Sequence, residues 1–247
     1  MFMARRRFFV DRIERGHARI NGDDAHHLTR VLRVEPGQKF EISDNQRAYL
    51  AEVETARKDL VSFAILEEIP AAPPAVHTTL FAALIKFERF EWIVEKATEL
   101  GVAVVIPVET ARSEKGLEQA AHKRLSRWQR IAREASEQSR RAHLPVIEPP
   151  IKLADLVGQT PRSAAGPLAG QFVLEEAEAP RILSILPEIR TPSDRVAILV
   201  GPEGGWTDDE RSRIASAGWR PVSLGPHILR AETAAIAALA IVNAAWQ

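Results

Sequence analysis

An uninterrupted apolar segment that leads directly into glycines restricts this chain to a small set of folds. Residues 196–200 read Val-Ala-Ile-Leu-Val and are followed at once by Gly201-Pro-Glu-Gly-Gly205. A strand without polar alternation is typical of the interior of a parallel sheet, which helices cover on both faces. Thr207 and Glu210 then have the spacing of a capping box, which predicts the start of a helix. The segment therefore predicts a strand, a tight turn and a helix within an α/β domain.

The same alternation of strands and helices extends over residues 76–247. The expected strands cover residues 78–84, 102–107, 171–174, 196–200 and 221–224. The expected helices cover residues 88–100, 117–141, 180–186, 207–218 and 232–246. Alternation of this kind predicts a mostly parallel sheet with helices on its faces.

Residues 1–70 have a different pattern, in which short strand candidates are separated by turn signals. The expected strands cover residues 18–20, 40–43, 49–53 and 60–66, and one expected helix covers residues 24–32 with Asp24 as its cap. Short strands around one helix predict a small β-barrel. Pro70, Pro73 and Pro74 interrupt regular structure, so we expect two domains there, at residues 1–70 and 76–247.

The composition excludes several classes of protein. The chain has no cysteine, which excludes disulfides, thiolate nucleophiles and zinc sites built from cysteine. The histidines lack ligand spacing, so we expect no metal. The sequence starts without the apolar stretch of a signal peptide, and the longest apolar run, residues 234–242, is too short to cross a bilayer. We therefore expect a cytoplasmic protein that does not act in a membrane.

The formal net charge of zero hides a segregation of charge along the chain. Residues 1–33 contain eight arginines and four acidic residues, and residues 112–141 contain nine basic and four acidic residues. Residues 142–210 reverse this balance, with five basic and eleven acidic residues. Segregation of this kind is typical of a protein with one face toward a polyanion, although ordinary solvated helix faces explain the same counts.

A second glycine-bearing segment follows the next expected strand. It reads Leu224-Gly-Pro-His-Ile-Leu-Arg-Ala-Glu-Thr-Ala234 and leads into an apolar helix. Ligands of open parallel sheets bind beyond the carboxyl ends of the strands, so the two glycine segments together predict one ligand site. Each segment alone also fits an ordinary tight connection. Neither contains the glycine pattern of a dinucleotide site or a P-loop, which argues against a nucleotide-dependent oxidoreductase.

These two segments, in this order, resemble the RsmE family. Other stretches similar to that family are Arg7-Phe-Phe9, the run from His26 to Arg33, the run from Glu91 to Val102, Arg127-Trp128 and the run from Glu134 to Ser139. The resemblance covers nearly the whole chain. It implies a SPOUT-class fold, with a C-terminal trefoil-knot α/β domain with a mostly parallel sheet, an N-terminal PUA-like β-barrel and a homodimer.

The resemblance also implies an activity. Members of the family use S-adenosylmethionine to methylate N3 of a uridine in 16S ribosomal RNA, which by family resemblance is uracil 1498. The expected partner is therefore 16S ribosomal RNA or the small ribosomal subunit. The alternative is a non-enzymatic RNA-binding or ribosome-assembly factor, which would have no need of both glycine segments.

The chain departs from the family pattern at three places. His227 stands where arginine is usual, and Arg140 stands where the family has a small residue, usually glycine. The usual Lys-Gly-Asp-Arg run is here Lys86-Phe-Glu-Arg89, which retains both bases and one carboxylate. A histidine is shorter than an arginine and only partly protonated near neutral pH, so it offers a substrate less charge and less reach at position 227.

The resemblance and the chemistry of the residues together give the candidate site. Uridine N3 must lose its proton before it can attack, which requires a base or a cation that stabilises the anion. The catalytic candidates are Arg230, Glu232 and Glu203, although Glu232 also suits a helix N-terminus by its charge alone. The cofactor is expected against Leu174, Gly201, Pro202, Glu203, Gly204, Gly205, Leu224, Gly225, Ile228 and Leu229. RNA contacts are expected from Arg7, His26, Arg30, Arg33, Lys86, Arg89, Arg112 and Arg141.

Overall fold

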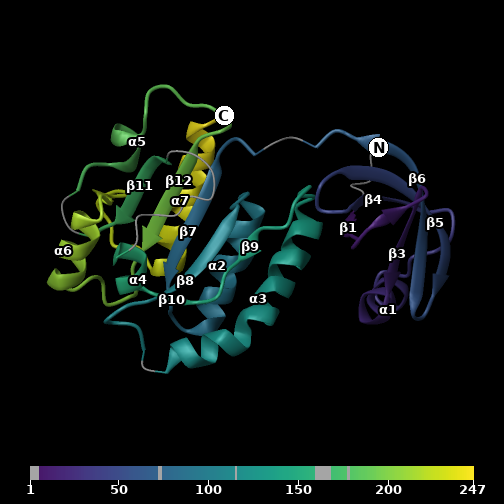
Figure 1. Ribbon diagram of the computed structural model, residues 1–247, viewed down its shortest axis with the longest axis horizontal. Helices are drawn as coiled ribbons and strands as arrows, with labels where there is room; N and C mark the ends of the chain where they lie inside the picture. Colours follow the sequence, from purple (N-terminus) through teal and green to yellow (C-terminus); the bar gives the residue numbers. More distant parts are fainter. Residues whose placement is uncertain (1–5, 72–73, 115, 159–167, 177–178) are drawn as a thin grey trace. The chain divides into compact units, whose positions relative to one another are not determined.

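The computed structural model of the chain divides into two compact units (Figure 1). Unit 1 comprises Met1–Ala72 and Ser136–Leu144, and unit 2 comprises Pro73–Ala135 and Pro145–Gln247. The structure describes residues 6–71, 74–114, 116–158, 168–176 and 179–247. Pro73 of the expected linker lies outside the described residues.

Unit 1 is a six-stranded sheet with one helix. Its elements are β1 (Arg7–Phe9), β2 (Ile13–Glu14), β3 (His17–Asn21), α1 (Gly22–Arg30), β4 (Lys39–Ser43), β5 (Ala48–Arg57) and β6 (Leu60–Ile69). The strands are hydrogen-bonded in the order β1-β4-β5-β6-β3-β2, with β1 parallel to β4 and the other neighbours antiparallel. Apolar residues that alternate along β3 and β5 point inward and form a core with Phe8, Leu28 and Phe63.

The segment Ser136–Leu144 belongs with unit 1 although the sequence places it inside the second domain. The hydroxyl of Ser43 donates to the carbonyl oxygen of Ala142 at 2.7 Å. The backbone N–H of Leu144 donates to the side-chain oxygen of Asn45, also at 2.7 Å. These bonds satisfy polar groups at the ends of β4 and the following turn, so unit 1 is built from two stretches of the chain.

Unit 2 is a parallel sheet with helices on both faces. Its elements are β7 (His77–Ala83), α2 (Phe87–Glu99), β8 (Val104–Glu109), α3 (Leu117–Gln138), β9 (Val146–Ile147), β10 (Ile151–Lys152), α4 (Leu153–Gly158), β11 (Leu168–Leu174), α5 (Ile182–Ile185), β12 (Arg195–Val200), α6 (Asp208–Ser216), β13 (Arg220–Val222) and α7 (Ala231–Ala245). The strand order is β10-β8-β7-β12-β11-β13, with β9 beside β8, and the described pairings are all parallel.

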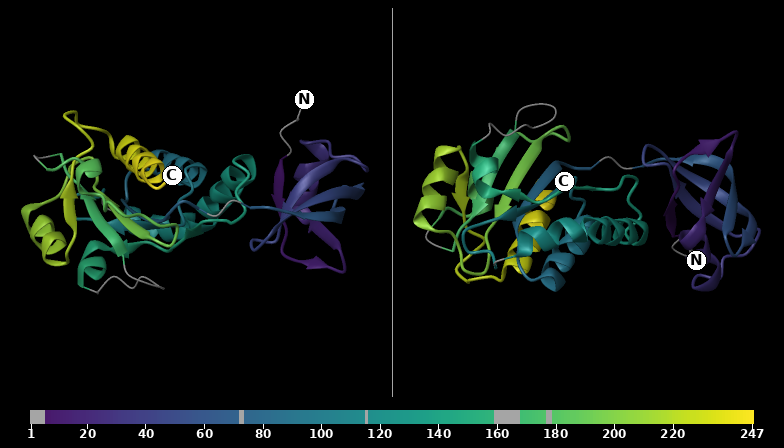
Figure 2. Two further views of the ribbon diagram at one scale, coloured as in Figure 1. Left: turned by 90° about the horizontal axis from the view of Figure 1, so that it is seen from above. Right: turned by 60° about the horizontal axis from the view of Figure 1, so that its bottom comes forward.

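The central strand β12 contributes to two cores, as its unbroken apolar sequence predicts. Ile198 and Val200 pack with residues of α2, α5 and α7 on one face of the sheet. Ala197 and Leu199 pack with residues of α4 and α6 on the other face. In the left view of Figure 2, α7 (yellow) lies alongside α2 (blue), and the two helices are in contact. The predicted parallel sheet with helices on its faces is confirmed.

The ends of two predicted helices are wrong. Helix α1 begins at Gly22 after Asn21, so Asp24 is not its cap but a residue of its first turn. Helix α3 ends at Gln138 and not at residue 141, because Arg140 has a φ of 58°, in the left-handed region that ends helices.

Candidate active site

A pocket lies where three neighbouring strands of unit 2 end. Leu174 ends β11, Val200 ends β12 and Ser223 follows β13, and α7 begins at Ala231. The pocket is lined by Leu174, Glu175, Glu176, Val200, Gly201, Pro202, Glu203, Gly205, Trp206, Arg211, Ser223, Leu224, Gly225, Pro226, His227, Ile228, Leu229, Arg230, Ala231 and Ala234. Both glycine segments thus form one pocket, at the edge of the sheet where parallel folds bind ligands.

Trp206 holds the first glycine segment in place. Its indole is buried, and Nε1 donates to the carbonyl oxygen of Leu174 at 3.1 Å. A Cβ at Gly201 would lie 3.0 Å from the indole ring, so the ring packs where a side chain would otherwise stand. Gly205 has a φ of 66°, which residues other than glycine adopt only at a cost. The turn is therefore shaped by Trp206 on one side and by backbone geometry on the other.

Gly204 is the one predicted cofactor contact that does not line the pocket. A Cβ at this position would meet Arg112, whose Cδ is 3.2 Å away. The Arg112 guanidinium donates a hydrogen bond to the Gly204 carbonyl oxygen. Arg112, predicted to contact RNA, thus binds the first glycine segment, although its side chain is also exposed.

The second glycine segment presents apolar side chains and a cation to the pocket. Gly225 and Ser223 form a tight turn, in which the Gly225 N–H donates to the Ser223 hydroxyl at 3.1 Å. Ile228 lines the pocket and is 76% exposed, so its aliphatic side chain is accessible to a ligand. Arg230 lines the pocket and precedes α7, and within the described residues its guanidinium makes no hydrogen bond or ion pair. This cation is therefore available to a ligand.

The two predicted catalytic carboxylates lie on either side of Arg89. Glu203 lines the pocket, and its Oε1 accepts a hydrogen bond from Arg89 Nη1 at 2.9 Å. Glu232 Oε1 is 3.9 Å from Arg89 Nε. The Glu232 side chain is only 9% exposed and does not line the pocket. The structure thus brings together Arg89, Glu203 and Glu232 from three parts of the chain, and of these three only Glu203 lines the pocket.

Glu175 and Arg211 are pocket residues that the sequence interpretation missed. Both oxygens of the Glu175 carboxylate accept from Arg211 Nε, at 3.1 and 3.3 Å. This hydrogen bond is the main reason why the pKa of Arg211 is raised above its usual value. Glu175 directly follows the predicted strand 171–174, so its position at a strand end was the signal that could have identified it.

Three of the four predicted RNA contacts in residues 1–33 are accessible. Arg30 and Arg33 are exposed, and His26 is half-buried. Arg7 is buried, and its guanidinium donates to Glu41 Oε2 at 2.8 Å and to the Arg140 carbonyl oxygen at 2.7 Å. Because these partners take up the Arg7 guanidinium within unit 1, the structure does not present it to RNA.

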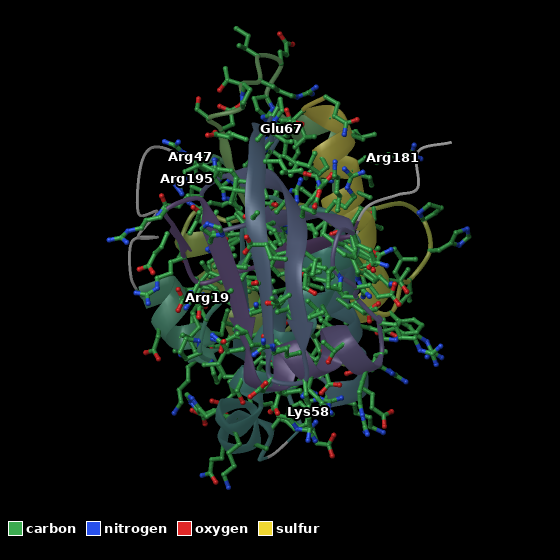
Figure 3. All side chains as sticks on the ribbon, turned by 90° about the vertical axis from the view of Figure 1, so that its right-hand side faces the viewer. Arg19, Arg47, Lys58, Glu67, Arg181 and Arg195 are labelled. Atoms are coloured by element: carbon green, nitrogen blue, oxygen red, sulfur yellow. The ribbon has the colours of Figure 1, made fainter. Side chains whose placement is uncertain are left out.

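Other bases of unit 1 differ in their exposure. Arg19, Arg47 and Lys58 are exposed (Figure 3), and Arg47 pairs with Glu68 at 3.3 Å. Arg141, a predicted RNA contact, is half-buried, and burial lowers its pKa to about 10. Its Nε donates to the His143 carbonyl oxygen at 3.2 Å.

Among the predicted RNA contacts of unit 2, Lys86 is exposed at the start of α2.

The described residues contain no group of histidine, cysteine and acidic side chains arranged to hold a metal ion. None of the helices in the described ranges has both the length and the apolar character needed to cross a membrane.

Comparisons with known proteins agree with this architecture. A model described as an RNA methyltransferase domain matches residues 72–243, and one described as an RNA methyltransferase PUA domain matches residues 20–66. The ribosomal RNA small subunit methyltransferase E of Synechocystis is 36% identical over 225 residues, which cover 89% of this chain and 70% of the relative. The Bacillus subtilis protein of the same name is 31% identical over 233 residues, covering 91% and 88%.

Two solved structures are similar over almost their whole length. The ribosomal RNA small subunit methyltransferase E of Neisseria gonorrhoeae, bound to S-adenosylmethionine, has a TM-score of 0.83 and 30% identity, with 98% of each chain covered. A Legionella pneumophila protein in complex with the same cofactor has a TM-score of 0.87 and 27% identity, again with 98% of each chain covered. Together with the matched family models, these similarities confirm the expected fold class and show that the chain belongs to the RsmE family of RNA methyltransferases.

Proposed function

We propose that the protein transfers the methyl group of S-adenosylmethionine to N3 of a uridine in 16S ribosomal RNA. The observation that carries this proposal is the pocket built from both glycine segments. Arg230 lines this pocket and has no hydrogen-bond or ion-pair partner within the described residues. The named relatives methylate RNA of the small ribosomal subunit, and two similar structures contain the cofactor.

The residues of the pocket fit this cofactor. Leu224, Ile228 and Leu229 offer an apolar surface for an adenine ring, and Gly205 and Gly225 have open space where a side chain would stand. S-Adenosylmethionine carries a positively charged sulfonium, and carboxylates such as Glu203 supply negative charge at the pocket. When bound, the cofactor supplies an electrophilic methyl group for an in-line displacement.

The chain's own residues prepare the uridine for attack. Loss of the N3 proton leaves a negative charge on the uracil, which the unpaired guanidinium of Arg230 stabilises. Glu203 lines the same pocket and is the carboxylate that accepts the proton. Glu232 is buried beside Arg89 and outside the pocket lining, so it acts on the reaction through its neighbours.

The proposed division of labour assigns RNA binding to residues 1–70 and methyl transfer to residues 76–247. Arg30 and Arg33 are exposed cations on unit 1, and neither makes an ion pair with a carboxylate within the described residues. Contacts of such cations with phosphates position an RNA without reading its sequence. The target base must leave its stack to enter the pocket of unit 2.

Deletion of the gene tests this function. Mass spectrometry of ribosomal RNA from the deletion strain should show the loss of one 3-methyluridine from 16S RNA and its return on complementation. Purified protein should then restore the mark on RNA from that strain, offered either as naked RNA or as small subunits. Binding of RNA without methyl transfer to either substrate would favour a non-enzymatic assembly factor.

A further inference from the structure

Arg89 connects a carboxylate of the pocket with a buried carboxylate behind it. Arg89 lies in the first turn of α2, a different part of the chain from both glycine segments. Its Nη1 donates to Glu203 Oε1 at 2.9 Å, and its Nε is 3.9 Å from Glu232 Oε1. The Arg89 side chain is 36% exposed, between the 43% of Glu203 and the 9% of Glu232. A planar guanidinium with five N–H donors is suited to contact two carboxylates at once.

Glu232 depends on Arg89 for its compensating charge. Its Oε2 is buried and has no hydrogen-bond partner within the described residues. The same part of the structure offers it one ion-pair partner, Arg89. Burial of a carboxylate without an opposite charge is costly, although the N-terminus of α7 offsets part of that cost. Glu232 therefore holds the Arg89 guanidinium where it reaches Glu203.

We propose that Arg89 is a positioning residue of the methyl-transfer site, which acts by fixing the Glu203 carboxylate at the pocket. This inference rests on the proposed function, because Glu203 is the proton acceptor there. It replaces the expectation from sequence that Arg89 contacts RNA phosphate. A Glu203 side chain released from Arg89 samples several rotamers, and displacement of a reacting group by about 1 Å lowers turnover by about 10²-fold.

The two roles of Arg89 predict different kinetics. A phosphate contact contributes to RNA affinity, and its loss lowers the slope of log affinity against log salt by about one unit. A positioning contact contributes to turnover after RNA and cofactor are bound, and its loss leaves that slope unchanged. The two roles can therefore be separated by measuring kcat and the salt dependence of RNA binding on the same variants.

The experiment compares Arg89→Ala, Arg89→Lys, Glu203→Gln and the double variant Arg89→Ala/Glu203→Gln with the wild type. Arg213→Ala is the matched control, because Arg213 is also an arginine of a surface helix and pairs with Asp209 at 3.0 Å on α6. We expect Arg89→Ala to lower kcat by about 10²-fold with an unchanged salt slope, and Arg89→Lys to recover part of that loss. The double variant should be no slower than the slower single variant, since each single variant already disrupts the Arg89–Glu203 pair.

Two results of the methyl-transfer experiment would overturn the inference. The first is an Arg89→Ala variant with wild-type kcat and a reduced salt slope, which makes Arg89 an RNA contact. The second is independent loss of kcat in the two single variants, so that their effects multiply in the double variant. If the wild type and Arg213→Ala both fail to methylate small-subunit RNA, the proposed substrate is wrong. The affinity for S-adenosylmethionine is then measured for the wild type, the two single variants and the double variant. If the effects of Arg89→Ala and Glu203→Gln on this affinity are additive in free energy, the inference is overturned.

Discussion

Trp206 determines which glycine of the first segment can be replaced. A Cβ at Gly201 would lie 3.0 Å from the buried indole ring, whereas a Cβ at Gly204 would meet the exposed Arg112 side chain, whose Cδ is 3.2 Å away. We expect Gly201→Ala to displace the indole and to weaken binding of S-adenosylmethionine by at least tenfold, about 1.4 kcal/mol. Gly204→Ala should bind nearly as the wild type, because Arg112 can move. Calorimetric titration of both variants checks this, and equal affinities would contradict it.

The sequence alone predicted cofactor contacts at Gly201, Gly204 and Gly205 without distinguishing among them. A glycine-rich turn predicts close approach of a ligand to backbone, and that interpretation fits Gly201 and Gly205, which line the pocket. It cannot predict what a Cβ at each glycine would meet. That depends on the indole of Trp206 and on Arg112, which belongs to a loop distant in the sequence. The segment was therefore predictable from the sequence, and the role of each glycine was not.

Arg230 is the residue whose replacement should separate binding from turnover. Its guanidinium lines the pocket without a partner within the described residues, so truncation leaves no buried charge uncompensated. We expect Arg230→Ala to bind RNA and cofactor but to lose about 10²-fold or more in kcat, the scale for one preorganised charge at a reacting centre. Single-turnover methyl-transfer assays at saturating RNA measure this. Full turnover in the variant would move the catalytic role to Glu203 or His227.

Glu210 of helix α6 contacts both the start of that helix and the loop that follows β8. Thr207 Oγ1 accepts from the Glu210 N–H at 3.2 Å, and Glu210 Oε2 accepts from the Thr207 N–H at 2.9 Å, as the sequence predicted. Glu210 Oε1 also accepts from the Ala111 N–H at 2.7 Å, a contact that no sequence pattern indicates. Glu210 is thus both the second residue of the capping box and a tertiary contact.

The double role of Glu210 predicts an unusually large effect for a cap residue. Glu210→Ala should lower the free energy of unfolding by about 1–3 kcal/mol, because it removes the carboxylate that accepts from the Thr207 N–H and leaves the Ala111 N–H unpaired. Thr207→Ala removes only the cap contact and should cost about 1 kcal/mol. Urea denaturation of the two variants measures the difference, and equal losses would show that the contact with Ala111 contributes nothing.

Long elements were predictable from the sequence, and short elements were not. The sequence predicted α2, α3 and α7 from their apolar periods, because each helix spans several turns. It predicted β12 from its unbroken apolar run, which is buried on both faces of the sheet. Strands β2, β9 and β10 have two residues each, too few for any period. The end of α3 was missed because Arg140 adopts a positive φ without being glycine, in a position that its ion pair with Glu41 stabilises.

The assembly of the whole molecule is expected to be a homodimer. Helix α7 is apolar around most of its circumference, and α2, which packs against it, exposes 61% of Trp92. We expect a second copy of the chain to cover this apolar surface. Light scattering at micromolar concentration should give about twice the chain mass of 27.4 kDa, and Trp92→Glu should shift the protein toward the monomer. A monomeric wild type would contradict this expectation.

Charge reversal on unit 1 tests whether the two units carry separate functions. Arg30 and Arg33 are exposed on unit 1, whereas the residues around the cofactor pocket all belong to unit 2. Arg30→Glu with Arg33→Glu should weaken RNA binding by about 1 kcal/mol or more for each lost phosphate contact, and should lower the salt slope by about two units. Affinity for S-adenosylmethionine should stay at the wild-type value, because no residue of the pocket is changed. Filter binding across a series of salt concentrations and calorimetry with the cofactor provide the two readouts.

Arg12→Glu, a reversal at an exposed arginine that already pairs with Glu14 at 3.2 Å, is the control for net charge. An equal loss of RNA affinity in that control would mean that net charge, and not a defined contact at Arg30 and Arg33, governs binding to unit 1.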